Sequence, residues 1–159
     1  MSCHQEKTNA IRILEKNGIP YESFRFETKA AVSGVEAAAI LGQDPDRVFK
    51  TLVTKAKFGA YYVFVIPVAK ELDLKKAAAA VGEKSVEMIP QKDLFPLTGY
   101  VHGGCSPIGM KKQFPTVLDR HAEGRPVILF SAGKIGWQIG TSPEGLRRVT
   151  GCTVADLCR

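Results

Sequence analysis

Two runs of β-branched and aromatic residues, at positions 48–56 and 61–67, constrain the fold of this 159-residue chain most strongly. Such residues pack well on a pleated surface, and each run has the length of a strand. Phe58-Gly59 lies between them, and glycine supplies the positive φ that a tight turn needs. The sequence therefore predicts a β-hairpin in the first half of the chain.

Helices with clear start and stop signals alternate with shorter strands. Ser33 and Glu36 have the spacing of a capping box, and Ser142-Pro143 has the order typical of a helix start. Helices are expected at residues 7–17, 33–42, 73–82, 90–97 and 142–149, and further strands at 21–27, 85–89, 115–119, 126–131 and 136–141. This interleaving, with hairpins, favours a mixed α/β fold over a strictly parallel one.

Length and composition are typical of a single globular domain over residues 1–159, without repeats or linkers. The chain is 45% hydrophobic and 24% charged, and its net charge of +6 permits a polyanionic partner without identifying one. No apolar run approaches the roughly 20 residues of a membrane span. Residues 1–7 contain no apolar signal segment, so we expect a cytoplasmic location.

A glycine-rich stretch at residues 100–109 and a lone lysine together predict a pocket. Glycine lets backbone N–H groups approach a ligand closely, because it has no Cβ. Lys50 lies in an otherwise apolar strand, between Phe49 and Leu52, where a lysine either reaches solvent or enters a pocket. This combination favours an anionic or ester-bearing ligand.

Other chemistries receive little support from the residues. Ser131-Ala132-Gly133-Lys134 lacks the upstream glycine and the following Ser or Thr of a phosphate loop, which leaves a tight turn between strands whose amides could line a pocket. Cys105 and His102 have the residue types of a nucleophile and a base, but a three-residue spacing on a loop fixes no such geometry. His121 is expected on a polar connection.

No metal site or cofactor is expected, because the cysteines and histidines match no zinc template. The expected state of all four cysteines is a free thiol in a reducing compartment: Cys3, Cys105, Cys152 and Cys158.

The same residues carry a family resemblance that extends from Lys7 to about Val149. Its most specific pieces are Phe49-Lys50-Thr51, Gly103-Gly104-Cys105-Ser106-Pro107-Ile108-Gly109 with Lys111-Lys112, and Ser131-Ala132-Gly133-Lys134. The chain resembles the YbaK/EbsC family of aminoacyl-tRNA deacylases, related to the editing domain of bacterial prolyl-tRNA synthetases, and within it the Cys-tRNA(Pro) deacylases. This resemblance implies a mixed, largely antiparallel, barrel-like sheet surrounded by helices.

The resemblance also implies the activity and the site. The substrate would be tRNA(Pro) carrying cysteine, hydrolysed in trans, with prolyl-tRNA synthetase as a transient partner and with neither DNA nor a membrane involved. Lys50 would orient the substrate near the terminal adenosine, and backbone amides from Gly103 onward would hold the aminoacyl carbonyl. The substrate's own thiol would attack that carbonyl, so no enzyme nucleophile is needed. The implied substrate-binding residues are Phe26, Ser33, Thr51, Tyr100, Gly104, Ser106, Pro107, Ile108, Gly109, Ser131 and Gly133.

Two departures from the family pattern affect substrate choice. Some members have an aromatic residue where this chain has Ser33, and some have Asp near the position of Gln138. An Ala-tRNA(Pro) deacylase therefore stays open as an alternative. Two further alternatives also stay open: a non-catalytic tRNA-binding regulatory module, and a thiol enzyme that uses Cys105. Candidate tRNA contacts are the basic residues Lys55, Lys57, Lys75, Lys76, Lys111, Lys112, Arg147 and Arg148.

Overall fold

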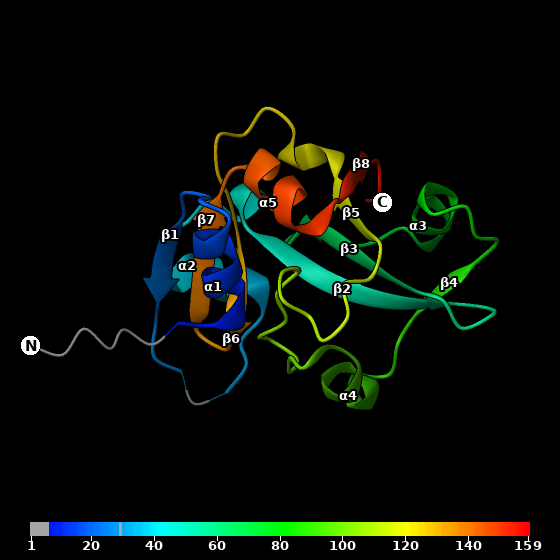
Figure 1. Cartoon of the computed structure of the whole chain (residues 1–159), viewed down its shortest axis with the longest axis horizontal. Helices are drawn as coiled ribbons and strands as arrows, with labels where there is room; N and C mark the ends of the chain where they lie inside the picture. Colours follow the sequence, from blue (N-terminus) through cyan, green and yellow to red (C-terminus); the bar gives the residue numbers. More distant parts are fainter. Residues whose placement is uncertain (1–6, 29) are drawn as a thin grey trace, which may run out of the picture.

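A computed structural model describes residues 7–28 and 30–159, so Cys3, His4 and the rest of residues 1–6 lie outside the described residues. The described part contains helices and strands in close alternation (Figure 1). None of its helices has the length and apolar character needed to cross a bilayer.

The predicted hairpin is confirmed and lies in a five-stranded sheet. Strands β2 (Phe49–Ala56) and β3 (Tyr61–Pro67) pair antiparallel, with Phe49 opposite Pro67 and Lys55 opposite Tyr61. The order of this sheet is β4-β2-β3-β5-β8. Its outer strands are β4 (Val86–Met88), β5 (Thr116–Asp119) and β8 (Thr153–Ala155). The last of these, β8, is absent from the sequence expectation.

A second, three-stranded sheet has the order β1-β7-β6. It consists of β1 (Glu22–Arg25), β6 (Ile128–Lys134) and β7 (Trp137–Thr141), all paired antiparallel. The segment 131–134, expected as a turn, instead ends strand β6 with a bulge between Ser131 and Lys134, and the turn follows it.

The two sheets meet where Val48 forms an isolated parallel bridge with Leu129. Among the named strands of residues 7–28 and 30–159, pairing is parallel only for β3 with β5 and β5 with β8, so the mixed and largely antiparallel expectation is confirmed. The pairings among these residues do not close into a barrel, and the barrel-like part of the expectation is not confirmed.

Five α-helices in the described chain surround the sheets (Figure 1). They are α1 (Asn9–Lys16), α2 (Gly34–Ile40), α3 (Leu74–Ala80), α4 (Leu94–Thr98) and α5 (Pro143–Thr150). The capping box of α2 is present, because the Ser33 hydroxyl accepts from the Glu36 amide and the Glu36 carboxylate accepts from the Ser33 amide. Helix α4 starts later than expected, because Pro90 precedes a short 3-10 turn, Gln91–Asp93, instead of opening the α-helix.

Strand β3 is buried on both faces, which explains its continuous apolar sequence. Val63 and Val65 belong to the core cluster shared with α1, α5 and the three-stranded sheet. Phe64 and Ile66 belong to the cluster beneath α3 on the other face. Successive side chains of a strand point to opposite faces, so a strand covered on both sides needs apolar residues at every position. The hairpin is thereby held rigidly at the centre of the fold.

Candidate functional site

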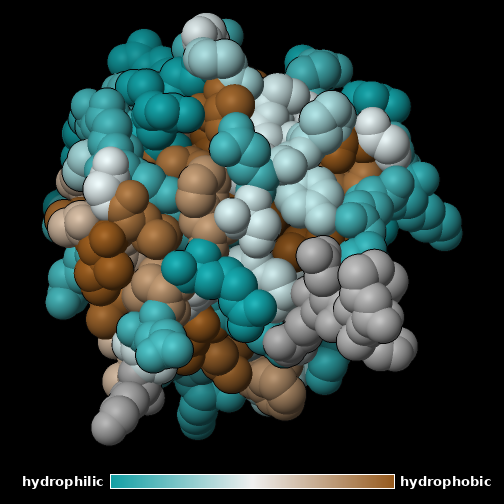
Figure 2. All heavy atoms as spheres, turned by 90° about the vertical axis from the view of Figure 1, so that its left-hand side faces the viewer, coloured by the Kyte–Doolittle hydropathy of each residue, from teal (hydrophilic) through white to brown (hydrophobic). Residues whose placement is uncertain are grey.

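A cavity of about 400 Å³ lies close to the junction of the two sheets. Its walls come from the start of β2, the start of α2, the glycine-rich loop and the β6–β7 turn. Apolar side chains reach the surface on the side of the molecule that carries β1 and α2, between polar ones (Figure 2). The lining includes Phe26, Ser33, Lys50, Thr51, Leu94, His102, Gly103, Cys105, Ser131, Lys134, Trp137 and Gln138.

Lys50 brings a positive charge to this cavity. It is half-buried in β2, opposite Ile66 in the hairpin register. Across residues 7–28 and 30–159, its ammonium group has neither a hydrogen-bond partner nor an ion-pair partner. The ionisable cavity residues are basic or neutral, because none of the described lining residues carries a carboxylate. The cavity therefore favours a ligand with negative or partially negative oxygen atoms.

Two further polar atoms of the cavity wall are buried without a partner. These are Thr51 Oγ1 and Gln138 Oε1, and the Gln138 side chain belongs to a residue that is only 7% exposed. A buried acceptor without a partner costs roughly 1–3 kcal/mol. In a cavity wall, such atoms indicate contacts that a ligand supplies.

The glycine-rich loop contributes only part of its length to the cavity. Gly103 and Cys105 line it, together with the exposed His102. Gly103 has φ +85°, a conformation that glycine adopts readily. The amide of Gly104 already donates to the carbonyl of Val101 at 2.9 Å. The loop amides available to a ligand are therefore fewer than the glycine content indicates.

The rest of the loop forms a support behind the cavity. The Tyr100 hydroxyl donates to the Ile108 carbonyl at 2.5 Å, and the Ser106 hydroxyl accepts from the Ile108 amide at 3.2 Å. A Cβ added at Gly133 would lie 2.8 Å from the Tyr100 ring, and one at Gly109 would lie 2.9 Å from its hydroxyl. The two glycines thus let the tyrosine pack tightly against the backbone of both segments.

The structure consequently divides the sequence-predicted residues into two groups. Those that line the cavity are Phe26, Ser33, Lys50, Thr51, Gly103 and Ser131. Those that lie outside the lining are Tyr100, Gly104, Ser106, Pro107, Ile108, Gly109 and Gly133. The hydroxyls of Ser33 and Ser131 are already engaged, by the helix cap and by the Gly133 amide at 3.0 Å respectively.

Trp137 and Gln138 line the cavity but were not among the predicted site residues. The indole of Trp137 donates to the Ser23 hydroxyl at 2.6 Å, and the guanidinium carbon of Arg25 lies 4.1 Å from its ring centroid. This packing fixes β7 against β1 and so fixes the neighbouring Gln138. The only local signal was the departure from the family pattern noted at position 138.

Cys105 does not have the character of a nucleophile. It is 9% exposed, and burial raises the pKa of its thiol to about 12. A nucleophilic cysteine needs a thiolate near neutral pH, and this one stays protonated. Burial likewise raises the pKa of Cys152 and that of Cys158, so none of these three cysteines is a reactive thiolate.

The comparison with known proteins decides the family. A family model described as an aminoacyl-tRNA editing domain matches residues 28–149, which include every residue of the cavity wall named above except Phe26. The chain belongs to the aminoacyl-tRNA editing domain family.

Relatives match this editing domain over nearly its whole length. A candidate Cys-tRNA(Pro)/Cys-tRNA(Cys) deacylase, EbsC of Enterococcus faecalis, is 47% identical and the alignment covers 96% of this chain and 94% of the relative. The crystal structure of a candidate trans-editing enzyme for prolyl-tRNA synthetase is 27% identical, with a TM-score of 0.82 over 98% of this chain and 99% of that one. The hypothetical protein APE2540 is 26% identical, with a TM-score of 0.85 over 95% and 99%.

Proposed function

We propose that this chain is a trans-editing hydrolase that removes cysteine from mischarged tRNA(Pro). The proposal is supported by membership of the editing family and by 47% identity over nearly the full length to a candidate Cys-tRNA deacylase. The observation that supports a particular site for this reaction is the ammonium group of Lys50, which is unpaired within the described residues. A lysine in a cavity without carboxylates suits an ester attached to a polyanion.

Each group in the cavity wall has a role in this reaction. The ammonium of Lys50 contacts oxygen atoms of the terminal adenosine and orients the ester. The amides of Gly103 and Cys105 face the aminoacyl carbonyl and stabilise the negative charge that develops on its oxygen. Thr51 Oγ1 and Gln138 Oε1 accept hydrogen bonds from the α-amino group, which gives these buried atoms the partners that the protein does not provide.

The nucleophile comes from the substrate. The cysteine thiolate of the substrate attacks its own ester carbonyl, so that a carbon–sulfur bond forms, the bond to the ribose oxygen breaks, and that oxygen takes up a proton. Water then opens the resulting thiolactone to give free cysteine. This route suits a cavity whose own cysteine stays protonated and which has no carboxylate among the lining residues.

The expected partners follow from the same chemistry. The tRNA backbone would contact basic side chains, and its binding should weaken with salt by about 0.7–0.9 in the log–log slope for each phosphate contact. Lys76 is less available than its neighbours, because it donates to Asp156 at 3.1 Å and to the Cys158 carbonyl at 2.7 Å. A transient complex with prolyl-tRNA synthetase, in the cytoplasm, completes the proposal.

A matched substrate panel tests the function. Purified protein is mixed in excess with tRNA(Pro) carrying cysteine, alanine or proline, and with tRNA(Cys) carrying cysteine, and release of the amino acid is followed in single turnover. Cysteine should be released at least ten times faster than alanine or proline. Faster release of alanine would make the protein an Ala-tRNA(Pro) deacylase, and binding of tRNA(Pro) without release would make it a regulatory module.

A further inference from the structure

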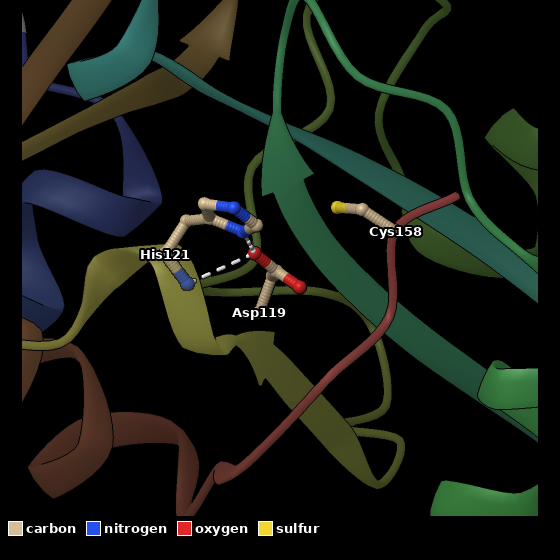
Figure 3. A group of neighbouring side chains, drawn as sticks. All are labelled: Asp119, His121 and Cys158. Carbon is tan, nitrogen blue, oxygen red and sulfur yellow. Dashed lines mark hydrogen bonds and ion pairs between the residues drawn. The ribbon is translucent and has the colours of Figure 1, made fainter.

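Three side chains that are far apart in the sequence converge at a second place in the fold. Asp119 ends strand β5, His121 lies in the 3-10 turn Arg120–Ala122 that follows it, and Cys158 lies in the C-terminal segment after β8. Their side chains point toward one another (Figure 3). One carboxylate oxygen, one imidazole nitrogen and one sulfur all lie within 4.8 Å of one another.

The backbone around this cluster is held firmly. Asp119 is fully buried and accepts from the amides of His121 at 2.9 Å and Leu157 at 3.0 Å. Cys158 pairs with Leu72 in an isolated bridge, and its carbonyl accepts from the Lys76 ammonium at 2.7 Å. The sulfur and the carboxylate are therefore pre-positioned by contacts that do not involve the His121 side chain.

The donor set is selective for one class of ion. Magnesium and calcium prefer oxygen ligands, whereas a sulfur, a nitrogen and an oxygen suit Zn²⁺, which is borderline soft. Ligand distances of about 2.0–2.3 Å around a tetrahedral zinc place the donor atoms roughly 3.3–3.8 Å apart, which the separation within the cluster allows. Three protein ligands leave a fourth position for water.

The exposed side of the cluster gives an ion its entry path. The His121 side chain is 37% exposed, whereas those of Asp119 and Cys158 are almost completely buried. In the structure, His121 Nδ1 forms a hydrogen bond with Asp119 Oδ2. The imidazole therefore has to move outward to admit an ion between these two atoms. A half-exposed side chain on a short turn can make that movement toward solvent.

We propose that Asp119 Oδ2, His121 Nδ1 and Cys158 Sγ form a zinc site that ties the C-terminal segment to strand β5. Zinc binding releases the thiol proton of Cys158 to solvent, and His121 binds through Nδ1 as the neutral imidazole, with its single proton on Nε2. None of the three residues lines the cavity near Lys50, so this site is separate from the proposed deacylation site.

Zinc and cobalt binding test the proposal directly. The protein is reduced, stripped of metal with a chelator and titrated with Zn²⁺ against a chelating dye, and Co²⁺ is added as a spectroscopic probe. A Cys3→Ser background removes the thiol of the N-terminal stretch from the titration. We expect one Zn²⁺ per chain, and Co²⁺ bands typical of four-coordination with a thiolate-to-metal charge transfer.

Matched variants identify the ligands. His121→Ala and Cys158→Ser should each weaken Zn²⁺ binding at least about 100-fold, and Cys158→Ser should abolish the charge-transfer band. Cys152→Ser, which changes another buried cysteine, and His102→Ala, which removes another histidine, should bind Zn²⁺ as the parent does. A stoichiometry well below one, or an unchanged Co²⁺ spectrum in both ligand variants, would overturn the proposal.

A melting experiment keeps the test independent of how well Cys158→Ser folds. Zn²⁺ at a hundredfold excess over its Kd should raise the Tm of the parent and of Cys152→Ser by about 5 °C or more. His121→Ala changes a half-exposed side chain, so its fold should persist without metal, and zinc should leave its Tm unchanged. An equal rise in His121→Ala would place the zinc elsewhere and refute the assignment.

Discussion

The Tyr100 hydroxyl donates a 2.5 Å hydrogen bond to the carbonyl of Ile108, across the base of the loop that supplies one wall of the cavity. Both residues are buried, and burial raises the pKa of Tyr100 to about 12. The phenol therefore stays protonated and remains a hydrogen-bond donor at any pH at which the protein functions. This bond joins the two ends of the loop behind the ligand cavity.

Replacing Tyr100 by Phe should destabilise the fold by about 1–3 kcal/mol, because the Ile108 carbonyl then stays buried without its partner. Urea unfolding measures the change. Tyr21→Phe is the matched control, since the Tyr21 hydroxyl donates to Glu15 in an exposed hydrogen bond of 2.7 Å and should contribute at most about 1 kcal/mol. Equal losses in both variants would show that the loop does not depend on this bond.

Lys50→Ala should reduce single-turnover hydrolysis of Cys-tRNA(Pro) at least about 100-fold, because a misplaced ester loses the advantage of orientation. Its stability should change by less than about 1 kcal/mol, because the substitution breaks no ion pair within the described residues. Lys84→Ala, which removes an exposed lysine outside the candidate tRNA contacts, is the control. Hydrolysis at the parent rate with an unchanged melt would refute the assignment of the site.

Cys105→Ser should retain most of the deacylase activity, within about tenfold of the parent. The thiol is buried and protonated, so it cannot serve as the attacking group, although it touches the cavity. Single-turnover hydrolysis and alkylation of the folded protein are the two measurements. A thousandfold loss in a folded variant, with rapid alkylation of the parent at Cys105, would restore the thiol-enzyme alternative.

The same residue predicts how stability depends on pH. The pKa of the Cys105 thiol is raised from 9.0 to about 12 on folding. The contribution of this thiol to the free energy of unfolding is therefore complete below pH 9 and is lost as pH rises toward 12. Between those limits the unfolded thiol ionises while the folded thiol stays neutral, at about 1.4 kcal/mol per pH unit. Urea unfolding from pH 8 to 11 should show a shallower decline for Cys105→Ser than for the parent. An equal decline of the free energy of unfolding with pH in the parent and in Cys105→Ser would contradict this prediction.

Most elements of the fold follow from local sequence signals. The hairpin, the capping box of α2 and the Ser142 cap of α5 each depend on residues within a few positions of one another, and the structure contains all three. Strand β8 was missed because Thr153–Ala155 is short and has no turn signal of its own. It becomes a strand only through parallel pairing with β5, which is a distant contact.

The residues of the cavity also differ in whether local sequence signals could predict them. Lys50 and the glycine-rich loop stand out in the sequence, because a charge in an apolar strand and a cluster of glycines are unusual locally. Gln138 does not stand out, since its approach to β2 depends on the pairing of Val48 with Leu129 across the two sheets. The group of Asp119, His121 and Cys158 is even harder to find from the sequence, because Cys158 reaches Asp119 only through the packing of the C-terminal segment.

The junction between the two sheets has a consequence for how substrate range can change. Lys50 and Thr51 belong to one sheet and Gln138 to the other, so the width of the space between them depends on how the two sheets pack against each other. A small change in the packing angle at Val48 and Leu129 would widen or narrow that space without altering any residue that contacts the ligand. The packing of Val48 against Leu129 therefore influences which amino acid fits in this space as directly as the contact residues do.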